Sequence, residues 1–546
     1  MSHDNNNNKR IKQKKNYGRG NDNKKFPSDY LRLPSSNSSS LPSRSSAAVN
    51  IPPHAWKTLV VLSCIAAMVM YAETMLIPAI PDLIKDFHVS YGMSSWILTS
   101  YLISGAVMTP IAGKLSDIYG KKKMLLSIMI IYGLGVSAAG FSNTIIFMLV
   151  SRAIQGIGLS MFPIAFSIVR EQFPRQKIAI GQGIISSMFA AGSSIGLYIG
   201  GTIIQHFGWH ATFFTITPIS IILLFTIWRV INIKKENSES IKSIAQIDVK
   251  GAATLATSII SFLLILTYSQ IDNSINDINS PVNMNSNNIH SANANAISLE
   301  QVLILFALGI TSLIAFIIIE KRAKYPLIDF KLLLNKAILP ANLMIMIFGI
   351  CMFTIFQTIP ILTRIPGPIG FEGNAIAAGS VQLPFALVLL IFGSTSGVLI
   401  SKFGSIKPII AGSIIMVVGF FVLSLLHSSE IAVSVNLAVV SAGMALINVG
   451  AMNVVTLVTP RQSIGISLGM NMLIRIIGSS IGPAIAGMYM QRYQSTINIH
   501  GLIQHFPSAN SFDLIFTTST VLSVGSLMLA LILSHRITKM RIPYLR

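Results

Sequence analysis

Three ionisable side chains lie deep inside long apolar stretches of this sequence: Glu73, Arg152 and Arg475. A charged group in the hydrocarbon of a bilayer is costly, so such residues usually mark the path of an ion, a proton or a substrate. Glu73 is the only carboxylate at that depth. Because a buried carboxylate can switch between a protonated and an ionised form as its surroundings change, we predict that Glu73 carries a proton.

Arg152 is the candidate partner of this carboxylate. Glu73 lies eight residues before Pro81, and Arg152 lies eight residues after Thr144. At a rise of about 1.5 Å per helical residue, both side chains lie about 12 Å from the same membrane surface. This equal depth allows Arg152 to pair with Glu73 and to set how readily the carboxylate binds a proton. The alternative is a static ion pair that only holds two helices together, a costly structural link in lipid.

Arg475 is a candidate substrate contact, because its guanidinium group could bind an anionic group or a carbonyl oxygen of a ligand. Equally, it could be an arginine whose long side chain extends to the edge of a cavity. Further candidate substrate contacts are Gln357, Asn448 and Asn453, which could as easily form hydrogen bonds between helices. The cysteine spacing gives neither a disulfide framework nor a metal site, so we expect no metal and no cofactor.

The composition places these residues in a membrane. Hydrophobic residues make up 52% of the 546 residues and charged residues only 11%, whereas soluble domains carry about 25% charged residues. Each apolar stretch is long enough for the ~20 helical residues that cross a bilayer. Fourteen such stretches are expected near residues 58–80, 93–112, 124–141, 145–167, 178–204, 210–229, 249–269, 299–319, 338–362, 374–400, 408–427, 431–456, 464–489 and 513–535.

The distribution of basic residues predicts the orientation. A net charge of +21 would suggest a nucleic-acid partner in a soluble protein. Here, with the N-terminus in the cytoplasm, only Lys85, Arg364 and Arg492 fall in loops on the outer side. This positive-inside pattern predicts a multi-pass protein of the cell membrane with both termini cytoplasmic and no nucleic-acid partner.

An internal repeat predicts how the fourteen segments are organised. The segments from Pro174 to Gly201 and from Pro460 to Gly487 align without a gap and share Pro-Arg-Gln and Gly-Ser-Ser-Ile-Gly. Such repeats are typical of transporters whose substrate site lies between two halves. The expected organisation is a disordered cytoplasmic tail (1–56), an N-terminal six-helix half (57–230), a linker with two inserted spans (231–336), a C-terminal six-helix half (337–536) and a cytoplasmic tail (537–546).

Small residues spaced by four allow helix backbones to approach closely. They predict either packed surfaces between halves that rock during transport or ordinary helix packing. The residues concerned are Gly192, Gly196, Gly200, Gly201, Gly478, Gly482, Pro483 and Gly487.

Four motifs together resemble the major facilitator superfamily, and in particular its fourteen-span drug:proton antiporter family. The loop Gly113–Lys123 is similar to G-x-L-a-D-r-x-G-r-k, and Leu149–Gly158 to l-x-x-x-R-x-x-q-G-x-g. Gly192–Gly201 resembles the antiporter element g-x-x-x-G-P-x-x-G-G, and Glu320–Phe330 resembles that family's junction before span nine. At the cytoplasmic end of the second and third segments, Asp117 could cap a helix or pair with basic residues, and such contacts could close a gate; the alternative, ordinary positive-inside charge, explains the lysines but not Asp117. The candidate gate residues are Gly113, Asp117, Gly120, Lys121 and Lys122.

Three positions depart from the family pattern. Ile118 replaces an arginine in the first loop, and Leu197 replaces the proline of the antiporter element. In the first span the family's acid aligns with Ala72, and an acid follows one position later, at Glu73. One residue turns a helix by about 100°, so the direction of this acid cannot be carried over from the family.

The resemblance implies an all-α polytopic membrane protein with the major facilitator fold, two six-helix halves and two inserted helices. It implies a secondary transporter that exports small amphipathic or drug-like compounds in exchange for protons by alternating access. Its partners would be the lipid bilayer, a small-molecule substrate and protons. The alternative is a uniporter or symporter of an anionic metabolite, which Arg475 favours. An enzyme is not expected, since the sequence lacks a helical metal-ligand pair and a G-x-S-x-G motif, and the two-half plan argues against a channel.

Overall fold

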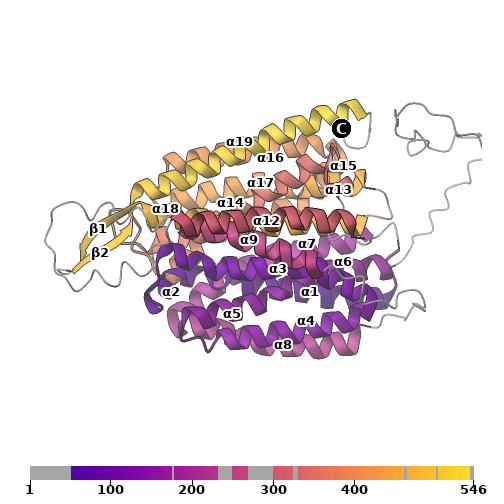
Figure 1. Cartoon of the computed structure of the whole chain (residues 1–546), viewed down its shortest axis with the longest axis horizontal. Helices are drawn as coiled ribbons and strands as arrows, with labels where there is room; N and C mark the ends of the chain where they lie inside the picture. Colours follow the sequence, from indigo (N-terminus) through magenta and orange to yellow (C-terminus); the bar gives the residue numbers. More distant parts are fainter. Residues whose placement is uncertain are drawn as a thin grey trace, which may run out of the picture. The chain divides into compact units, whose positions relative to one another are not determined.

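The computed structural model describes residues 51–174, 178–231, 249–268, 299–323, 330–459, 464–499 and 502–540. The tail expected to be disordered falls almost wholly outside the described residues, as do the loop 269–298, most of both Pro-Arg-Gln loops and the last six residues. The described part is almost entirely helical (Figure 1).

The first half consists of six membrane-length segments, two of which are interrupted. α1 continues through a 3₁₀ turn into a short helix, and the fourth segment contains a 3₁₀ turn at its middle. The elements are α1 (Pro53–Thr74), η2 (Ile77–Ala79), α2 (Ile80–Asp86), α3 (Tyr91–Tyr119), α4 (Lys121–Ala139), α5 (Ile145–Gly156), η3 (Ile157–Ser160), α6 (Met161–Gln172), α7 (Ile178–Phe207) and α8 (Trp209–Val230).

The rest of the described chain holds the inserted pair, the second half and one β-hairpin that the sequence did not predict. The elements are α9 (Val249–Tyr268), α12 (Leu299–Arg322), α13 (Phe330–Leu333), α14 (Ile338–Arg364), α15 (Ala375–Phe403), α16 (Ile406–Leu425), α17 (Glu430–Val458), α18 (Ile464–Arg492), β1 (Gln494–Ile499), β2 (Leu502–Pro507) and α19 (Ala509–Met540). β1 and β2 pair antiparallel at the same end of the bundle as α2, which we call the hairpin end (Figure 1).

Each of the fourteen expected segments coincides with a helical segment. In the part of the chain that the structure describes, thirteen are long and apolar enough to cross a membrane. The remaining one is α9, whose apolar part is the shorter segment Lys250–Ile265. The count of fourteen therefore fits the structure, with α9 as the segment on which it depends.

Helix packing repeats between the two halves. In the first half α1 packs against α7 and α8, α3 against α5, and α4 against α5 and α8. In the second half α14 packs against α18 and α19, α15 against α17, and α16 against α17 and α19. Figure 1 shows the first half in indigo to magenta and the second in orange to yellow. The sequence repeat thus corresponds to two six-helix halves with the same contacts.

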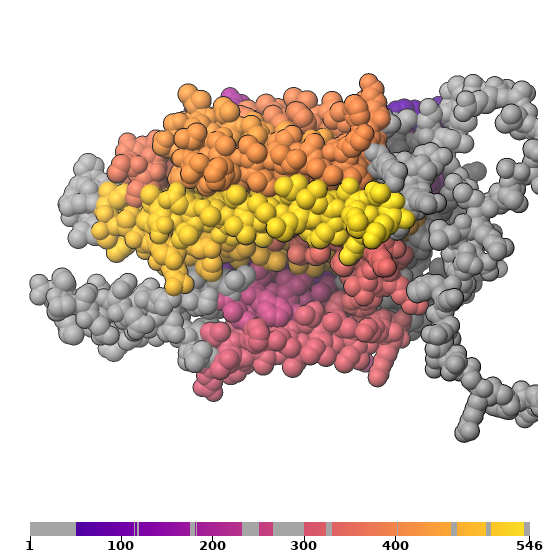
Figure 2. All heavy atoms as spheres, turned by 90° about the horizontal axis from the view of Figure 1, so that it is seen from above, coloured from indigo at the N-terminus to yellow at the C-terminus, as the bar shows by residue number. Residues whose placement is uncertain are grey.

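The two halves meet along two seams. α3 packs against α18 on one seam, and α7 packs against α15 on the other. α9 and α12 pack against each other, and α9 also contacts α3 and α18, where Ile103, Leu263 and Ala484 form a small apolar cluster. The inserted pair therefore covers the α3–α18 seam. α12 exposes large apolar side chains such as Leu303 and Ile304, as expected for a helix in contact with lipid. Figure 2 shows the face of the molecule on which α12 and α19 lie.

The Gly-Ser-Ser-Ile-Gly segments bring helices together inside each half. A Cβ atom at Gly192 of α7 would lie 2.2 Å from the Ala67 carbonyl oxygen of α1, and one at Gly478 of α18 would lie 2.2 Å from the Met346 carbonyl oxygen of α14. Gly196 and Gly200 contact α1, and Gly482 contacts α14, in the same way. These five glycines pack helices within a half, and a role in the rocking of the halves stays a prediction for them.

Two further glycines do contact the opposite half. A Cβ atom at Gly201 would lie 2.6 Å from the Ala375 carbonyl oxygen of α15, and one at Gly487 would lie 3.0 Å from the Tyr91 carbonyl oxygen of α3. Pro483 is buried inside α18 between these two kinds of contact. Close approach of the halves therefore depends on the hairpin-side ends of α7 and α18.

Candidate functional site

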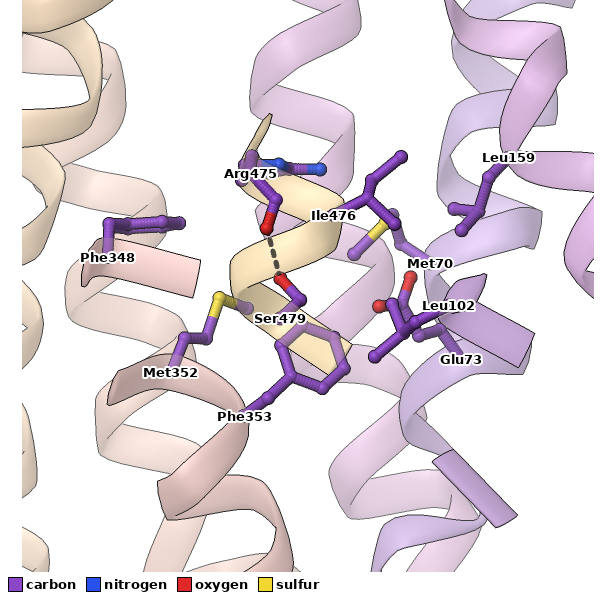
Figure 3. A pocket seen from close by; sticks show the side chains of 10 residues that line it. All are labelled: Met70, Glu73, Leu102, Leu159, Phe348, Met352, Phe353, Arg475, Ile476 and Ser479. Atoms are coloured by element: carbon purple, nitrogen blue, oxygen red, sulfur yellow. Dashed lines mark hydrogen bonds between the residues drawn. The ribbon is translucent and has the colours of Figure 1, made fainter. Parts of the chain in front are cut away.

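One small cavity lies where the two halves meet (Figure 3). The space that water can occupy in it is about 10 Å³, close to the room that one water molecule needs. Its lining comes from α1, α3, η3, α14 and α18: Met70, Glu73, Leu102, Leu159, Phe348, Met352, Phe353, Arg475, Ile476 and Ser479. A drug-sized molecule does not fit in the cavity as it stands, so the halves must separate before one can enter.

Glu73 lies in the last turn of α1 and faces this cavity (Figure 3). Only 3% of the residue is exposed. Among the described residues, its carboxylate has neither a hydrogen-bond donor nor an ion-pair partner. A buried carboxylate without partners is costly. Glu73 therefore needs a proton, a ligand or a cation that moves toward it.

Arg475 faces the same cavity from α18, in the opposite half (Figure 3). Its carbonyl oxygen accepts a 3.0 Å hydrogen bond from the Ser479 hydroxyl, but its guanidinium group has no hydrogen-bond or ion-pair partner among the residues described. The guanidinium carbon lies 5.9 Å from the centre of the Phe189 ring of α7, within the range of a cation–π contact. In the alignment of the two repeats, Phe189 is the counterpart of Arg475. Equivalent positions of the two halves are therefore in contact.

Arg152 is fully buried in α5 and is held by the first half alone. Its Nε donates to the Ile97 carbonyl oxygen at 3.1 Å, and its Nη1 donates to Gln155 Oε1 at 2.9 Å. The guanidinium carbon lies 4.6 Å from the centre of the Tyr101 ring. These contacts fix the group on α3 and α5.

The expected ion pair between Glu73 and Arg152 is not formed in this structure. Equal depth is compatible with the fold, but depth does not determine the direction of a side chain around its helix. Glu73 lines the cavity between the halves, whereas Arg152 is held on α3 and α5. The cation that shares this cavity with Glu73 is thus Arg475, which the sequence marks only as a candidate substrate contact.

The sequence did not single out a polar cluster around Arg152. Two buried polar atoms there, Arg152 Nη2 and Tyr101 Oη, have no hydrogen-bond partner among the described residues, and the side chains of Gln155 and Tyr132 lie beside each other in the same cluster. Buried polar atoms are nearly always hydrogen-bonded in native proteins, to ordered water if not to protein. The cluster is therefore suited to hold water beside the cavity. In the sequence, only the tyrosines within apolar stretches indicate this polar cluster, and they do so weakly.

The other candidate substrate contacts do not line the cavity. Gln357 of α14 is buried and donates from Nε2 to Ser94 Oγ of α3 at 3.0 Å, which joins the halves. Asn453 of α17 donates to Ser405 Oγ at 2.7 Å, beside α16. Asn448 is partly buried on α17. Of the four candidates, only Arg475 lies in the cavity.

The loop after α3 lies at the end of the bundle opposite the hairpin. Gly120 has a φ of +93°, a value that glycine adopts without strain. Lys121 pairs with Glu171 of α6, and Lys122 donates to the Trp228 carbonyl oxygen of α8 at 2.7 Å. These two contacts join helices of the first half and not the two halves. Gly113 has open space around it, and the side chain of Asp117 lies outside the described residues.

The hairpin end carries an ion pair between the halves. Arg364, at the end of α14, donates from Nη2 to Asp82 Oδ1 at 2.6 Å and from Nη1 to the second carboxylate oxygen. Nη1 also donates to the Pro78 carbonyl oxygen at 3.3 Å. Such a two-pronged contact between arginine and carboxylate is geometrically specific. It holds the two halves together at this end.

Comparisons with known proteins agree with this architecture. The family model of the Major Facilitator Superfamily matches residues 62–483. The chain is 26% identical over 461 residues to the multidrug transporter protein MdtP of Bacillus subtilis, covering 83% of this chain and 79% of that protein. It is 24% identical to the tetracenomycin C resistance and export protein of Streptomyces glaucescens, and the match covers 80% of this chain and 76% of that protein.

A solved structure shares the fold. The human organic anion transporter MFSD10 (TETRAN) superposes with a TM-score of 0.57 over 88% of this chain and all of that chain, at 14% identity. At this identity the likeness concerns the fold alone. The family match over most of the chain, the two packed halves and the transporter relatives together show that this chain is a multi-pass membrane transporter of the Major Facilitator Superfamily.

Proposed function

We propose that this transporter exports small amphipathic or drug-like compounds in exchange for protons. The observation that carries the proposal is the Glu73 carboxylate, which is buried in a cavity between the two halves and has no hydrogen-bond or ion-pair partner among the described residues. The names of the bacterial relatives, a multidrug transporter and a resistance and export protein, support the choice of cargo. The orientation we propose has both termini in the cytoplasm of the cell and the hairpin end outside.

The exchange of a proton for a cargo molecule follows if both compete for the Glu73 carboxylate. When Glu73 is ionised it attracts a positive group, either from the cargo or from Arg475 on the other half. When Glu73 is protonated, that attraction is lost and a positively charged cargo is released. Because the cavity is too small for cargo in this structure, each step requires the halves to rock around the site. A proton and a cargo then cross in opposite directions, because they do not occupy Glu73 together.

A uniporter or symporter of an anionic metabolite is the second candidate. It is favoured by Arg475, a cation in the cavity whose guanidinium group is not hydrogen-bonded to the described residues. In such a transporter an anion would bind Arg475 best when Glu73 is protonated. In a symporter of this kind, proton and anion would move in the same direction, whereas exchange moves proton and cargo in opposite directions.

Purified protein in liposomes separates these functions. A fluorescent amphipathic cation is added outside, and its uptake is followed with an imposed pH gradient, acidic inside or acidic outside. Exchange predicts uptake only when the lumen is acidic and arrest on addition of a proton ionophore. Uptake that is indifferent to the gradient, or that is driven by an acidic exterior, contradicts the proposal.

The ion pair at the hairpin end yields a prediction about access to the cavity. Arg364→Gln should raise labelling of a Ser479→Cys reporter from the outside by about fivefold, since losing a partly exposed ion pair costs about 1 kcal/mol. The reporter is built in a variant in which Cys64 and Cys351 are replaced by serine. Labelling rates with a membrane-impermeant maleimide give the measurement.

Asp86→Asn is the matched control for this experiment. Asp86 lies four residues after Asp82 on α2, and its carboxylate accepts a 2.8 Å hydrogen bond from Trp209 Nε1 of α8, within the same half. Its removal should leave the labelling rate unchanged. Equal effects of the two substitutions would show that Arg364 does not control this end.

A further inference from the structure

The cavity presents two opposite charges, neither of which is satisfied by the described residues. Glu73 comes from α1 and Arg475 from α18, and both residues line the same cavity (Figure 3). Glu73 is 3% exposed, and no donor reaches its carboxylate in the part of the chain that the structure describes. Because the two groups belong to different halves, a ligand that binds both also bridges the moving parts.

The rest of the lining is apolar and adaptable. It consists of methionine, leucine, isoleucine and phenylalanine side chains with a single hydroxyl group, that of Ser479. Met70 and Met352 line the cavity from opposite halves. Methionine side chains adjust to ligands of different shape. The lining therefore selects for an apolar body without fixing its outline, and the two charges supply the polar recognition.

Ligands with one charge leave the other group of the site unpaired. A purely cationic ligand at Glu73 would bring a positive charge close to Arg475, and a purely anionic ligand at Arg475 would bring a negative charge close to Glu73. Like charges in a poorly solvated site repel each other, and an unpaired buried charge is costly. A ligand that carries both signs satisfies both groups at once.

We propose that the cavity recognises amphipathic zwitterions, with an ammonium group bound by Glu73, an acidic group bound by Arg475 and an apolar body against Phe348, Phe353 and the methionines. The proposal deepens the proposed export function, because it names the class of cargo. The ammonium group competes with the proton for Glu73, so exchange is preserved. On cargo binding the Glu73 carboxyl releases its proton to water on the side to which the cavity is open.

Three matched probes test this recognition: 2-naphthylalanine, its methyl ester, which keeps only the ammonium charge, and its N-acetyl derivative, which keeps only the carboxylate. Equilibrium binding is measured on the full chain in lipid nanodiscs, without a pH gradient. We expect the zwitterion to bind at least about tenfold more tightly than either derivative, since each lost charge pair costs on the order of 1.4 kcal/mol. Equal affinities, or no binding of 2-naphthylalanine, would overturn the proposal.

Two substitutions assign the charges. Arg475→Gln should remove the preference for the zwitterion over the ester, and Glu73→Gln should remove the preference over the N-acetyl derivative. Arg475→Lys should retain most of the preference over the ester, which a merely structural role of Arg475 would not predict. Arg492→Gln, a control on the same helix, should change neither ratio. An unchanged zwitterion-to-ester ratio in Arg475→Gln would refute the role of Arg475.

The binding test is independent of the transport test. Zwitterion preference without proton-driven uptake would refute proton exchange and leave the recognition intact. Proton-driven uptake of cations without zwitterion preference would do the reverse. The two proposals therefore fail separately.

Discussion

Replacing Glu73 with glutamine should abolish the dependence of transport on a pH gradient. Glutamine keeps the size and hydrogen-bonding capacity of the side chain but cannot gain or lose a proton. In liposomes, uptake driven by an acidic lumen should fall to the level of protein-free vesicles. Because glutamine resembles the protonated acid, binding of the N-acetyl derivative of naphthylalanine should persist, which would show that the site is still formed.

Two further variants serve as comparisons for Glu73→Gln. Glu73→Asp keeps a carboxylate, set back by one methylene, and should retain part of the gradient dependence. Glu430→Gln neutralises an acid in the first turn of α17, away from the cavity, and should transport like the unmodified chain. Gradient-driven uptake at full rate in Glu73→Gln would exclude Glu73 as the proton carrier, since the substituted side chain does not titrate.

Placing leucine at Gly192 should strongly destabilise the transporter. A Cβ atom at this position would lie 2.2 Å from the Ala67 carbonyl oxygen. This neighbour is backbone and cannot rotate away, so α7 and α1 must separate. Overpacking of this kind costs about 1–3 kcal/mol or more. We expect a lower midpoint of thermal unfolding in detergent and a smaller monodisperse fraction on size-exclusion chromatography.

The same helix supplies the control. Gly183 also lies in α7, but no atom comes within 4 Å of a Cβ atom built there. Gly183→Leu should leave thermal stability unchanged or slightly higher, because leucine favours helix more than glycine does. In the second half, Gly478→Leu and Gly469→Leu repeat the comparison on α18, with the same expected contrast. Equal stability of the Gly192 and Gly183 variants would mean that the close approach of α1 and α7 is not needed.

The membrane segments could be predicted from the sequence because length and apolarity alone determine them. A stretch of about 20 apolar residues has few stable alternatives to a helix across the bilayer. Interruptions within those stretches were missed. The α1 segment changes to a 3₁₀ turn at Ile77–Ala79, and the fourth segment does so at Ile157–Ser160. Their boundaries depend on tertiary contacts, which hydropathy does not report.

The site could be predicted in part. The cost of burying a charge identified Glu73, Arg152 and Arg475, and the rise of a helix per residue gave the depth of Glu73 and Arg152. Which of them face one another depends on how each helix is rotated and on how the halves pack. Glu73 therefore proved to share the cavity with Arg475, while Arg152 is engaged by Ile97 and Gln155. The hairpin between α18 and α19 was missed because short alternating strands in a loop give a weak pattern.

The position of the inserted pair makes the two flanks of the transporter unlike. α9 lies over the junction of α3 and α18, whereas α7 and α15 form the other junction. A lipophilic compound dissolved in the bilayer that approaches sideways between the halves thus meets an additional helix on one flank. For such a compound, the flank formed by α7 and α15 is the one that α9 does not cover.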